Sequence, residues 1–445
     1  MNENIFIRRD GEVTTALQLA MDVAAAAGDR LVLQAGVHLC GALRLPSGLD
    51  LVLGEGAVLR FVADYAAYAS NRVDVIAEDS DTAMMVAQGA SSIRISGPGV
   101  IEAPGTDYIV GRLEDMGTHV PAAKRPRVLV MQGCENVDLG GLSVRSSPMW
   151  TIHLIDCRTV RIEGLSVDND REMPNTDGIV IDSCQDVVIR DCDIATADDG
   201  VVLKTSIGPD GRAVGACRNI LVEHCRIESR SCALKIGTES HGDFEAITFR
   251  DCDIVRSNRA IGIFSRDGGH VRGIVGQRLR VEAHETPEGF WGSGEAITIN
   301  VIDRRPGKPA GRVENVVFED ISGAMEGAVN LVADSRSGIA DVRLARINLR
   351  QVPGRYRGER YDVRPTHFDL APSPDAAGRA NAWVKDENGQ VIGLVAYPGG
   401  MPGLLSQNVE GLTLEDVEFD RPSPLPEGWN PEAVVLLTGQ PAVWS

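Results

Sequence analysis

Aspartates stand before two similar apolar strands in the stretch PNTDGIVIDSCQDVVIRDCDIATADDGVVLKTS, residues 174–206. Asp177 opens the first copy, and Asp198 and Asp199 open the second, so that Asp199 follows Asp177 after 22 residues. In a scaffold that stacks its coils, equivalent positions lie one strand spacing apart, about 4.8 Å. We therefore expect Asp177, Asp198 and Asp199 to meet in one small patch.

Three carboxylates at such a separation would do acid–base chemistry. A single aspartate in a bend is commonly a turn former, but close carboxylates repel one another and raise the pKa of at least one of them. The patch would then hold a protonated acid beside ionised bases. Hydrolysis of a glycosidic bond needs an acid for the leaving oxygen and a carboxylate that activates water or acts as the nucleophile. The sequence does not give the separation of the groups, so the stereochemical outcome does not follow from it.

Charged residues are expected on the outer face of the same strands, because side chains alternate between the two faces. If the isoleucines of residues 179–182 point inward, Asp182 points outward, and Lys204 occupies the equivalent place one coil later. The register that we expect for the next coil sets Lys235 level with Lys204. Asp182, Lys204 and Lys235 would form a charged ladder, which is either a salt-bridged sheet face or a cationic floor for a carboxylated substrate.

The element that must position these residues is a repeated strand, bend and strand, which recurs from Ser92 onward. Taking Val137, Val160, Val187 and Ile220 as equivalent gives steps of 23, 27 and 33 residues. Self-similarity at this period without intervening helices is typical of a solenoid of β-coils. We predict an all-β protein, a single-stranded right-handed parallel β-helix.

The open N-terminal end of this solenoid needs a cap. Residues 13–27, VTTALQLAMDVAAAA, have apolar residues at helical spacing and end at Gly28. We predict a capping helix there, with Thr14 or Thr15 as its N-cap.

A chain of 445 residues exceeds the size at which one globular core stops growing, which also favours an elongated repeat. We expect one domain, with a cap and first coils at 1–60, main coils at 61–350, an insertion at 351–407 and a last coil and tail at 408–445. Residues 104–127 also break the coil rhythm. Insertions in solenoids are commonly loops on the binding face, although they also serve to cover a sheet edge.

Composition limits the partners. There are 63 acidic and 44 basic side chains, a net charge of −19, which argues against nucleic acid and anionic membranes but permits an anionic sugar where cations converge. No apolar stretch reaches the roughly 20 residues of a membrane helix and no signal-like segment is seen, so a cytoplasmic location is expected. The nine cysteines include no CxxC pair and are expected to be small buried thiols. No motif indicates a cofactor or a structural metal, and the oligomeric state is not predicted.

Five phrases of the sequence resemble the polygalacturonase family, glycoside hydrolase family 28. They are RP at 125–126, SPMWTIHL at 147–154, NTDG at 175–178, ADDGVVLKT at 197–205 and SHG at 240–242. The likeness extends from the N-terminal helix to about residue 350. It implies a right-handed parallel β-helix and inverting, metal-free hydrolysis of galacturonan or rhamnogalacturonan.

The resemblance also implies residue roles. Asp198 matches the general acid, and Asp177 and Asp199 match the pair that binds and activates water. His241 matches a histidine that hydrogen-bonds near the acid, and Asn175 belongs to the NTDG motif that contacts substrate. Lys204 and Lys235 are expected to bind substrate as well.

The sequence departs from this family at one strand. Family members usually carry an Arg-Ile-Lys strand whose cations hold a galacturonate carboxylate beside the cleaved bond. The expected register places Phe264 at the arginine and Arg266 at the lysine, which exchanges a bidentate cation for an apolar ring. This suggests a neutral, methylated or differently linked sugar, with Arg266 or nearby Arg259 still able to bind a carboxylate.

Further substrate contacts are expected from the coil before the aspartates and from the second insertion. Trp150 would stack on a sugar ring, or else pack under the 104–127 segment, and His153 lies on the same face. The insertion interleaves arginines and tyrosines that would close over a negatively charged substrate. These are Arg355, Tyr356, Arg357, Arg360 and Tyr361.

We therefore expect a glycosidase that acts on pectin-derived saccharides, with exo action on oligosaccharides because two insertions would wall off one end of a cleft. Two rivals are a calcium-dependent polyuronate lyase, since acidic clusters bind calcium, and a non-catalytic carbohydrate-binding β-helix that keeps only the scaffold.

Overall fold

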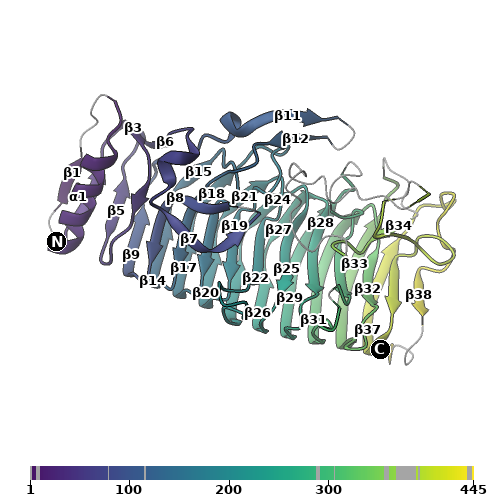
Figure 1. The fold of residues 1–445 in the computed structure, drawn as a ribbon. Coiled ribbons are helices and arrows are strands. Elements are labelled where there is room, and N and C mark those ends of the chain that lie inside the picture. The colour runs from purple at the N-terminus through teal and green to yellow at the C-terminus, as the bar shows by residue number, and fades with distance from the viewer. Residues whose placement is uncertain are drawn as a thin grey trace.

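The computed structural model describes residues 3–6, 11–78, 80–114, 117–286, 291–304, 306–354, 360–366, 387–388, 391–437 and 443–444. Two long sheets, mostly of parallel strands, run the length of the molecule as stacked coils (Figure 1). The predicted parallel β-helix is confirmed.

One sheet has thirteen strands and carries the candidate site. Its strands are β4 (Leu43–Arg44), β7 (Arg72–Ala77), β8 (Ser80–Gln88), β13 (Arg127–Gln132), β16 (Ile152–Ile155), β19 (Ile179–Asp182), β22 (Val201–Thr205), β25 (Cys232–Ser240), β28 (Arg259–Ser265), β30 (Ile297–Val301), β32 (Val329–Ala333), β36 (Leu404–Gln407) and β38 (Val434–Leu437). β7 is the exception to the parallel stack, because it pairs antiparallel with β8.

The other sheet has 22 strands and forms the remaining sides of the coils. Its strands are β1 (Glu3–Phe6), β2 (Arg30–Leu33), β3 (Gly36–Cys40), β5 (Asp50–Leu53), β6 (Ala57–Phe61), β9 (Ser91–Ser96), β10 (Val100–Glu102), β14 (Glu135–Gly140), β15 (Ser143–Arg145), β17 (Arg158–Glu163), β18 (Ser166–Asp168), β20 (Gln185–Arg190), β21 (Asp193–Thr196), β23 (Cys217–Glu223), β24 (Arg226–Ser229), β26 (Phe244–Arg250), β27 (Asp253–Ser257), β29 (Val271–Ala283), β31 (Val313–Met325), β33 (Ile339–Gln351), β37 (Val409–Asp420) and β39 (Val443–Trp444).

The predicted repeat register is confirmed at every step. Val137 pairs with Val160, Val160 with Val187, and Val187 with Ile220. These side chains belong to one apolar core that continues through the coils. Since full burial of a Val or Ile side chain stabilises a fold by about 1.5–3 kcal/mol, the repeated inward positions hold the stack together.

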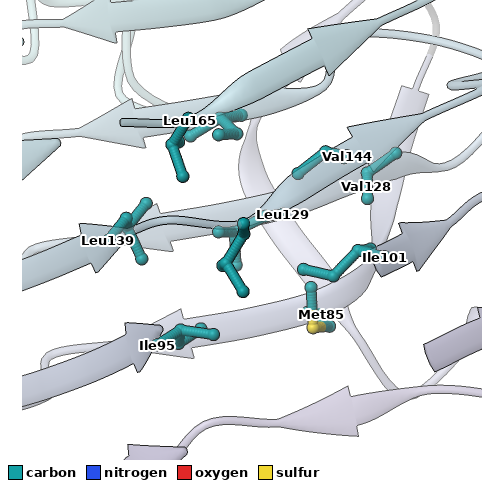
Figure 2. A pocket seen from close by; sticks show the side chains of 10 residues that line it. Met85, Ile95, Ile101, Val128, Leu129, Leu139, Val144 and Leu165 are labelled. Carbon is teal, nitrogen blue, oxygen red and sulfur yellow. The ribbon is translucent and has the colours of Figure 1, made fainter. Parts of the chain in front are cut away.

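The core contains a small cavity between the sheets, lined entirely by apolar side chains (Figure 2). Such a cavity stays dry and offers a ligand no polar partner, so it is a packing gap and not a binding site. The nine cysteines are free and buried, as predicted. Within the described residues no helix has the length and apolar character of a membrane span.

Helix α1 (Thr14–Ala27) covers the N-terminal end of the solenoid, as predicted (Figure 1). Leu17, Met21 and Ala24 face the core, and Gly28 ends the helix in the left-handed conformation at φ 68°. The predicted threonine N-cap is wrong. Thr14 lies inside the helix, where its hydroxyl accepts a hydrogen bond from Gly41 N at 2.7 Å.

Both segments that break the coil rhythm contain antiparallel pairs, β11 (Ile109–Leu113) with β12 (Thr118–Pro121) and β34 (Arg360–Asp362) with β35 (Leu394–Ala396). Figure 1 shows both along the upper edge of the solenoid. The expected boundaries were too wide, because β13, β33 and β36 are ordinary coil strands. The second insertion therefore runs from 352 to 403.

Candidate active site

The aspartates lie in a row of stacked positions, each two residues before an inward strand residue. The paired residues Ile152, Ile179, Val201, Leu234, Ile261 and Ile297 define the register. The row, which we call the axial row, consists of Trp150, Asp177, Asp199, Cys232, Arg259 and Glu295. Backbone hydrogen bonds of 2.9 Å from Thr151 N to Asp177 O and from Gly178 N to Asp199 O hold its central members together.

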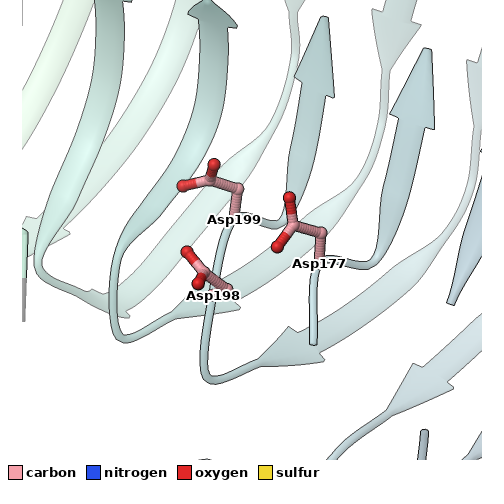
Figure 3. Close-up of side chains that lie close together, drawn as sticks. All are labelled: Asp177, Asp198 and Asp199. Atoms are coloured by element: carbon pink, nitrogen blue, oxygen red, sulfur yellow. The ribbon is translucent and has the colours of Figure 1, made fainter. Parts of the chain in front are cut away.

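Asp177 and Asp199 occupy successive places in this row, and Asp198 lies beside them in the same bend (Figure 3). One carboxylate oxygen of each lies within 4.8 Å of those of the other two. The three residues are only 2%, 6% and 2% exposed. The prediction that they meet is confirmed, and the three carboxylates are nearly buried.

A glycine follows each stacked aspartate because there is no room for a side chain. A Cβ on Gly178 would lie 2.6 Å from the carbonyl oxygen of Gly200, and one on Gly200 would lie 2.4 Å from a methyl group of Ile227. Such contacts would force the backbone apart. The Asp-Gly pairs are therefore the reason that the carboxylates approach so closely.

The three carboxylates have different surroundings. Burial, followed by the charges of Asp198 and Asp199, raises the pKa of Asp177 well above its usual value. Asp199 is bound by Lys235 Nζ at 2.6 Å and by Ser231 Oγ at 3.0 Å. Asp198 accepts a hydrogen bond from Asn175 N at 3.2 Å. The cluster thus combines a carboxyl that favours its proton with a carboxylate neutralised by an ammonium group.

Lys204 and Glu239 form an ion pair beside the cluster, with 2.6 Å between Nζ and Oε2. Burial alone would lower the pKa of Lys204, but Glu239, Asp177 and Asp199 outweigh it and raise that pKa. Lys204 also lies 4.8 Å from the centroid of the Trp150 ring. It therefore contributes a fixed positive charge next to the carboxylates.

The expected charged ladder is wrong in two respects. Lys235 pairs in register with Val202 and not with Lys204, because β22 and β25 pair with a step of 33 residues at this point, from Val202 to Lys235. Asp182 is fully buried and bonded to His153 Nε2 at 3.3 Å and to Ser206 N at 2.9 Å. It does not face solvent.

His153 and Trp150 were expected to contact substrate, but both side chains are buried. His153 is fully buried with its Nδ1 2.9 Å from Arg127, and burial lowers its pKa to about 4. Trp150 is 5% exposed and packs with Ala77, Val180 and Val202. Trp150 packs under another segment of the chain, as the alternative held. That segment is the end of β7 at Ala77 and not residues 104–127.

Ile263 points into the core, so residues 262–264 and residues 264–266 both follow the outward, inward, outward order of the Arg-Ile-Lys strand. The register expected for that strand remains a prediction. A Cβ on Gly262 would lie 2.4 Å from the Phe264 ring, so the ring fills the space of both side chains.

Arg266 and Arg259 are not available to a carboxylated sugar, contrary to expectation. Arg266 is fully buried and donates to Asn300 O at 2.8 Å and to the carbonyls of Val363 and Pro365 at 3.0 Å. Arg259 is 2% exposed and pairs with Asp362 at 3.1 Å and Glu295 at 3.4 Å. Phe264 is 1% exposed beneath them. These arginines hold the second insertion against the coils.

The arginine–tyrosine segment is described only in part. Arg355, Tyr356 and Arg357 lie outside the described residues. Arg360 is exposed, whereas Tyr361 is 5% exposed and packs against Tyr397 with ring centroids 5.0 Å apart. Tyr361 therefore serves packing of the insertion.

His241 makes contacts with charged neighbours. Its Nε2 lies 3.7 Å from Asp267, and its Nδ1 lies 3.0 Å from Lys308 Nζ. Arg304 in turn binds both oxygens of Asp267, at 3.0 and 2.7 Å. The placement near the acid that the resemblance implies remains a prediction.

Glu78, Glu239 and Ser231 were missed from the sequence. Half-buried Glu78 follows β7 at φ 46°, and burial, then Glu239 and Asp198, raise its pKa to about 7. Only the fold brings Glu78 to the cluster, about a hundred residues away along the chain. Glu239 stands two residues before His241 in the ESHGD segment, so its position was a usable signal.

The arrangement suits acid–base hydrolysis, and three carboxylates are also a donor set that a divalent cation accepts. Lys235 at 2.6 Å from Asp199 already supplies positive charge inside the cluster. This ammonium group offsets the charge of one of the three carboxylates.

Residues 64–277 match the model of glycosyl hydrolases family 28. A probable polygalacturonase from Vitis vinifera is 26% identical over 284 residues, covering 60% of this chain and 56% of that protein. An endo-polygalacturonase from Pectobacterium carotovorum subsp. carotovorum is 23% identical over 72% of this chain and 80% of its own length. The structure of an exopolygalacturonase from Thermotoga maritima superposes with a TM-score of 0.65 at 20% identity, covering 78% of this chain and 87% of its own.

The chain is a parallel β-helix with stacked carboxylates at its strand entrances. The part of the chain that carries the aspartates, residues 64–277, is similar to glycosyl hydrolases family 28, the family of the polygalacturonases. The chain spans about half the length of the grape relative, 56%. The likeness to the solved structure, at 20% identity, concerns the fold alone.

Proposed function

We propose that the chain hydrolyses glycosidic bonds of pectin-derived saccharides at the Asp177, Asp198 and Asp199 cluster. The observation that carries this proposal is the meeting of three nearly buried carboxylates within 4.8 Å, one of them bound by Lys235. Asp198 protonates the leaving oxygen. Asp177, at a pH where it has lost its proton, and Asp199, stacked one coil apart, hold and activate the water that attacks the anomeric carbon.

We propose inversion of configuration, which rests on the family resemblance. Two-carboxylate inverting enzymes keep these groups about 6.5–9.5 Å apart, whereas about 5–5.5 Å is usual for retention. The oxygens here, within 4.8 Å, lie nearer the second range. Three carboxylates replace two, however, and the ammonium of Lys235 draws charge away from Asp199, which makes it a poorer nucleophile and a better partner for water.

Exo action on oligosaccharides is the finer part of the proposal. The second insertion is bound to the outer face two coils beyond Asp199 through Arg259, Asp362 and Arg266. A polymer lying along the coils would collide with it. The endo-polygalacturonase and the exopolygalacturonase among the similar proteins leave both modes open to the family.

A screen of defined galacturonan and rhamnogalacturonan oligosaccharides tests the proposal, with products separated by size. Release of short saccharides by the intact protein, and none by Asp198→Asn, is expected. Exo action would be contradicted if the viscosity of a polymer solution fell before reducing ends accumulated. Unsaturated products would indicate a lyase, and binding without cleavage would indicate a non-catalytic module.

A further inference from the structure

The Phe264 side chain is buried, but it points away from the apolar core of the coils. Ile263 faces that core, and side chains alternate along a strand, so Phe264 faces outward although it is only 1% exposed. Three cations lie over its ring. The ring centroid is 5.7 Å from Lys235 Nζ, 4.9 Å from the Arg259 guanidinium and 5.7 Å from the Arg266 guanidinium. Each distance lies within the roughly 6 Å at which an aromatic face attracts a cation.

Gly262 makes room for this ring directly beside Lys235. Lys235 of β25 pairs in register with Gly262 of β28, so the two residues occupy neighbouring outward positions. A Cβ on Gly262 would lie 2.4 Å from Cε2 of the Phe264 ring, so the ring takes the place of a side chain at 262. On the opposite side Lys235 pairs with Val202, which is fully buried. The Lys235 stem therefore runs between an aliphatic side chain and an aromatic ring.

The Lys235 ammonium has one hydrogen-bond acceptor among the residues that the structure describes, Asp199 Oδ2 at 2.6 Å. An ammonium carries three donors on a flexible four-carbon stem, and a single acceptor does not fix its direction. Only 12% of the side chain is exposed, so water replaces few of the missing contacts. The face of the Phe264 ring supplies a second attraction, which offsets part of the lost hydration.

The same ring lies against two arginines whose partners are in the second insertion. Arg259 pairs with Asp362 at 3.1 Å, and Arg266 donates to backbone carbonyls of the insertion. Lys235 instead pairs with Asp199. Three cations repel one another, but the ring attracts each of them, which lets them surround one side chain while each keeps its own partner.

The place of the Lys235 ammonium matters for the proposed base. After burial, the charges of Asp198 and Asp199 raise the pKa of Asp177, and those of Lys204 and Lys235 lower it. An ammonium that moved away from the cluster would leave Asp177 with less compensation.

We infer that Phe264 is a positioning residue whose ring holds the Lys235 ammonium against Asp199. This inference rests on the proposed function and deepens it, because it gives a buried ring outside the three aspartates a part in the reaction. Phe264 acts through Lys235 and makes no contact with the reacting atoms of its own.

A double-mutant cycle in denaturant unfolding tests the contact itself and needs no substrate. The four proteins are the intact chain, Phe264→Leu, Lys235→Met and the double variant. Methionine keeps an apolar stem beside the ring, so the cycle reports on the ammonium. We expect Phe264→Leu to lower the folding equilibrium constant about fivefold more in the intact background than in the Lys235→Met background, as for a cation–π contact. Equal losses in the two backgrounds would overturn the inference.

The effect on the reaction is measured as kcat/KM against pH, on a pectic fragment that the intact protein cleaves. Without the ring the ammonium is held less firmly, so the acidic limb of Phe264→Leu should move to higher pH, toward that of Lys235→Met. The double variant should show no shift beyond that of Lys235→Met. A ring that serves packing alone would leave the limb in place, and that result would contradict the inference. If the intact protein cleaves no fragment, the proposed function is refuted, whereas the unfolding cycle still decides whether the ring holds the ammonium.

Phe249→Leu is the matched control, because Phe249 is fully buried in the apolar core on β26 of the other sheet. It should lower stability without coupling to Lys235→Met and without moving the acidic limb. A limb that moves as far as in Phe264→Leu would show that general loosening explains both results. If Phe264→Leu does not fold, the intact protein decides by NMR. A nuclear Overhauser effect is expected between the Phe264 ring protons and the Lys235 ε-protons, assigned by their loss in Lys235→Met, and its absence would refute the contact.

Discussion

Lys235 Nζ lies 2.6 Å from Asp199 Oδ2, one coil beyond the strand that Asp199 opens. This ion pair places a cation inside a cluster of three carboxylates, and its charge also lowers the pKa of Asp177. Burial and the neighbouring aspartates outweigh that effect and raise the Asp177 pKa. Lys204 and then Lys235 lower this pKa, so loss of the Lys235 charge should raise it further.

Replacing Lys235 by methionine should shift the pH–rate profile. Without the cation the pKa of Asp177 rises further, so the activity that needs ionised Asp177 begins at higher pH, by about one unit for loss of a near opposite charge. The acidic limb of kcat/KM against pH measures this. If the acidic limb of kcat/KM lies at the same pH in a Lys235→Met variant with native thermal stability, Asp177 is not the base.

Asp198→Asn should lower kcat by about 10²–10⁴-fold, the usual contribution of a general acid. Asparagine keeps the oxygen that accepts from Asn175 N, so the fold and substrate affinity should be retained. Circular dichroism and binding of an unhydrolysed fragment are the controls. Full turnover by this variant would assign the acid elsewhere.

Glu78 gives a prediction about stability. Its pKa is about 7 in the folded protein against a usual 4.5, so the folded state binds the extra proton between these values and stability falls as pH rises through them. Glu78→Gln removes this loss, which amounts to about 3 kcal/mol at 1.36 kcal/mol per pH unit. In denaturant unfolding, the unfolding free energy of Glu78→Gln should rise relative to that of the original protein between pH 4 and pH 8. An equal difference at both pH values would mean that Glu78 is not held in its raised state.

Asp362→Asn should loosen the second insertion. The change leaves Arg259 and Arg364 buried with less charge compensation, and breaking a buried pair costs about 3–5 kcal/mol. Faster proteolysis within residues 352–403 and a lower unfolding free energy are expected. Arg360→Gln, an exposed change in the same strand, should stay within about 0.5 kcal/mol. Equal behaviour of the two variants would show that Asp362 does not hold the insertion.

Treatment with a chelator should leave the activity unchanged, because Lys235 and Lys204 supply the positive charge beside the carboxylates. The same assay followed by ultraviolet absorbance should detect no unsaturated sugar. Loss of activity that calcium restores, together with an absorbing product, would favour the lyase.

Much of the fold could be predicted from the repeat. One apolar position recurs once in each coil, at Val137, Val160, Val187 and Ile220, and the Asp-Gly pairs repeat with it. The stacking of Asp177 on Asp199 follows from that regularity. Lys235 was misplaced because its match to Lys204 assumed a step of 31 residues, whereas the pairing of Val202 with Lys235 shows a step of 33.

The partners of the buried arginines could not be predicted in the same way. Arg259 and Arg266 find their partners in Asp362, Val363 and Pro365, about a hundred residues along the chain and outside the repeat. A solvent-exposed arginine and a buried one have the same local sequence pattern. Glu78 was missed for the same reason, because only the path of β7 across the coils carries it to Asp198.

The most direct test of inverting hydrolysis at the three aspartates is proton NMR of the anomeric signals during cleavage of a defined α-linked pectic disaccharide. We expect the β-anomer of the released sugar to appear first and to equilibrate later, and we expect Asp198→Asn to release nothing. Initial appearance of the α-anomer would contradict inversion. Failure of the intact protein to release any sugar from galacturonan or rhamnogalacturonan fragments would contradict hydrolysis at the Asp177, Asp198 and Asp199 cluster.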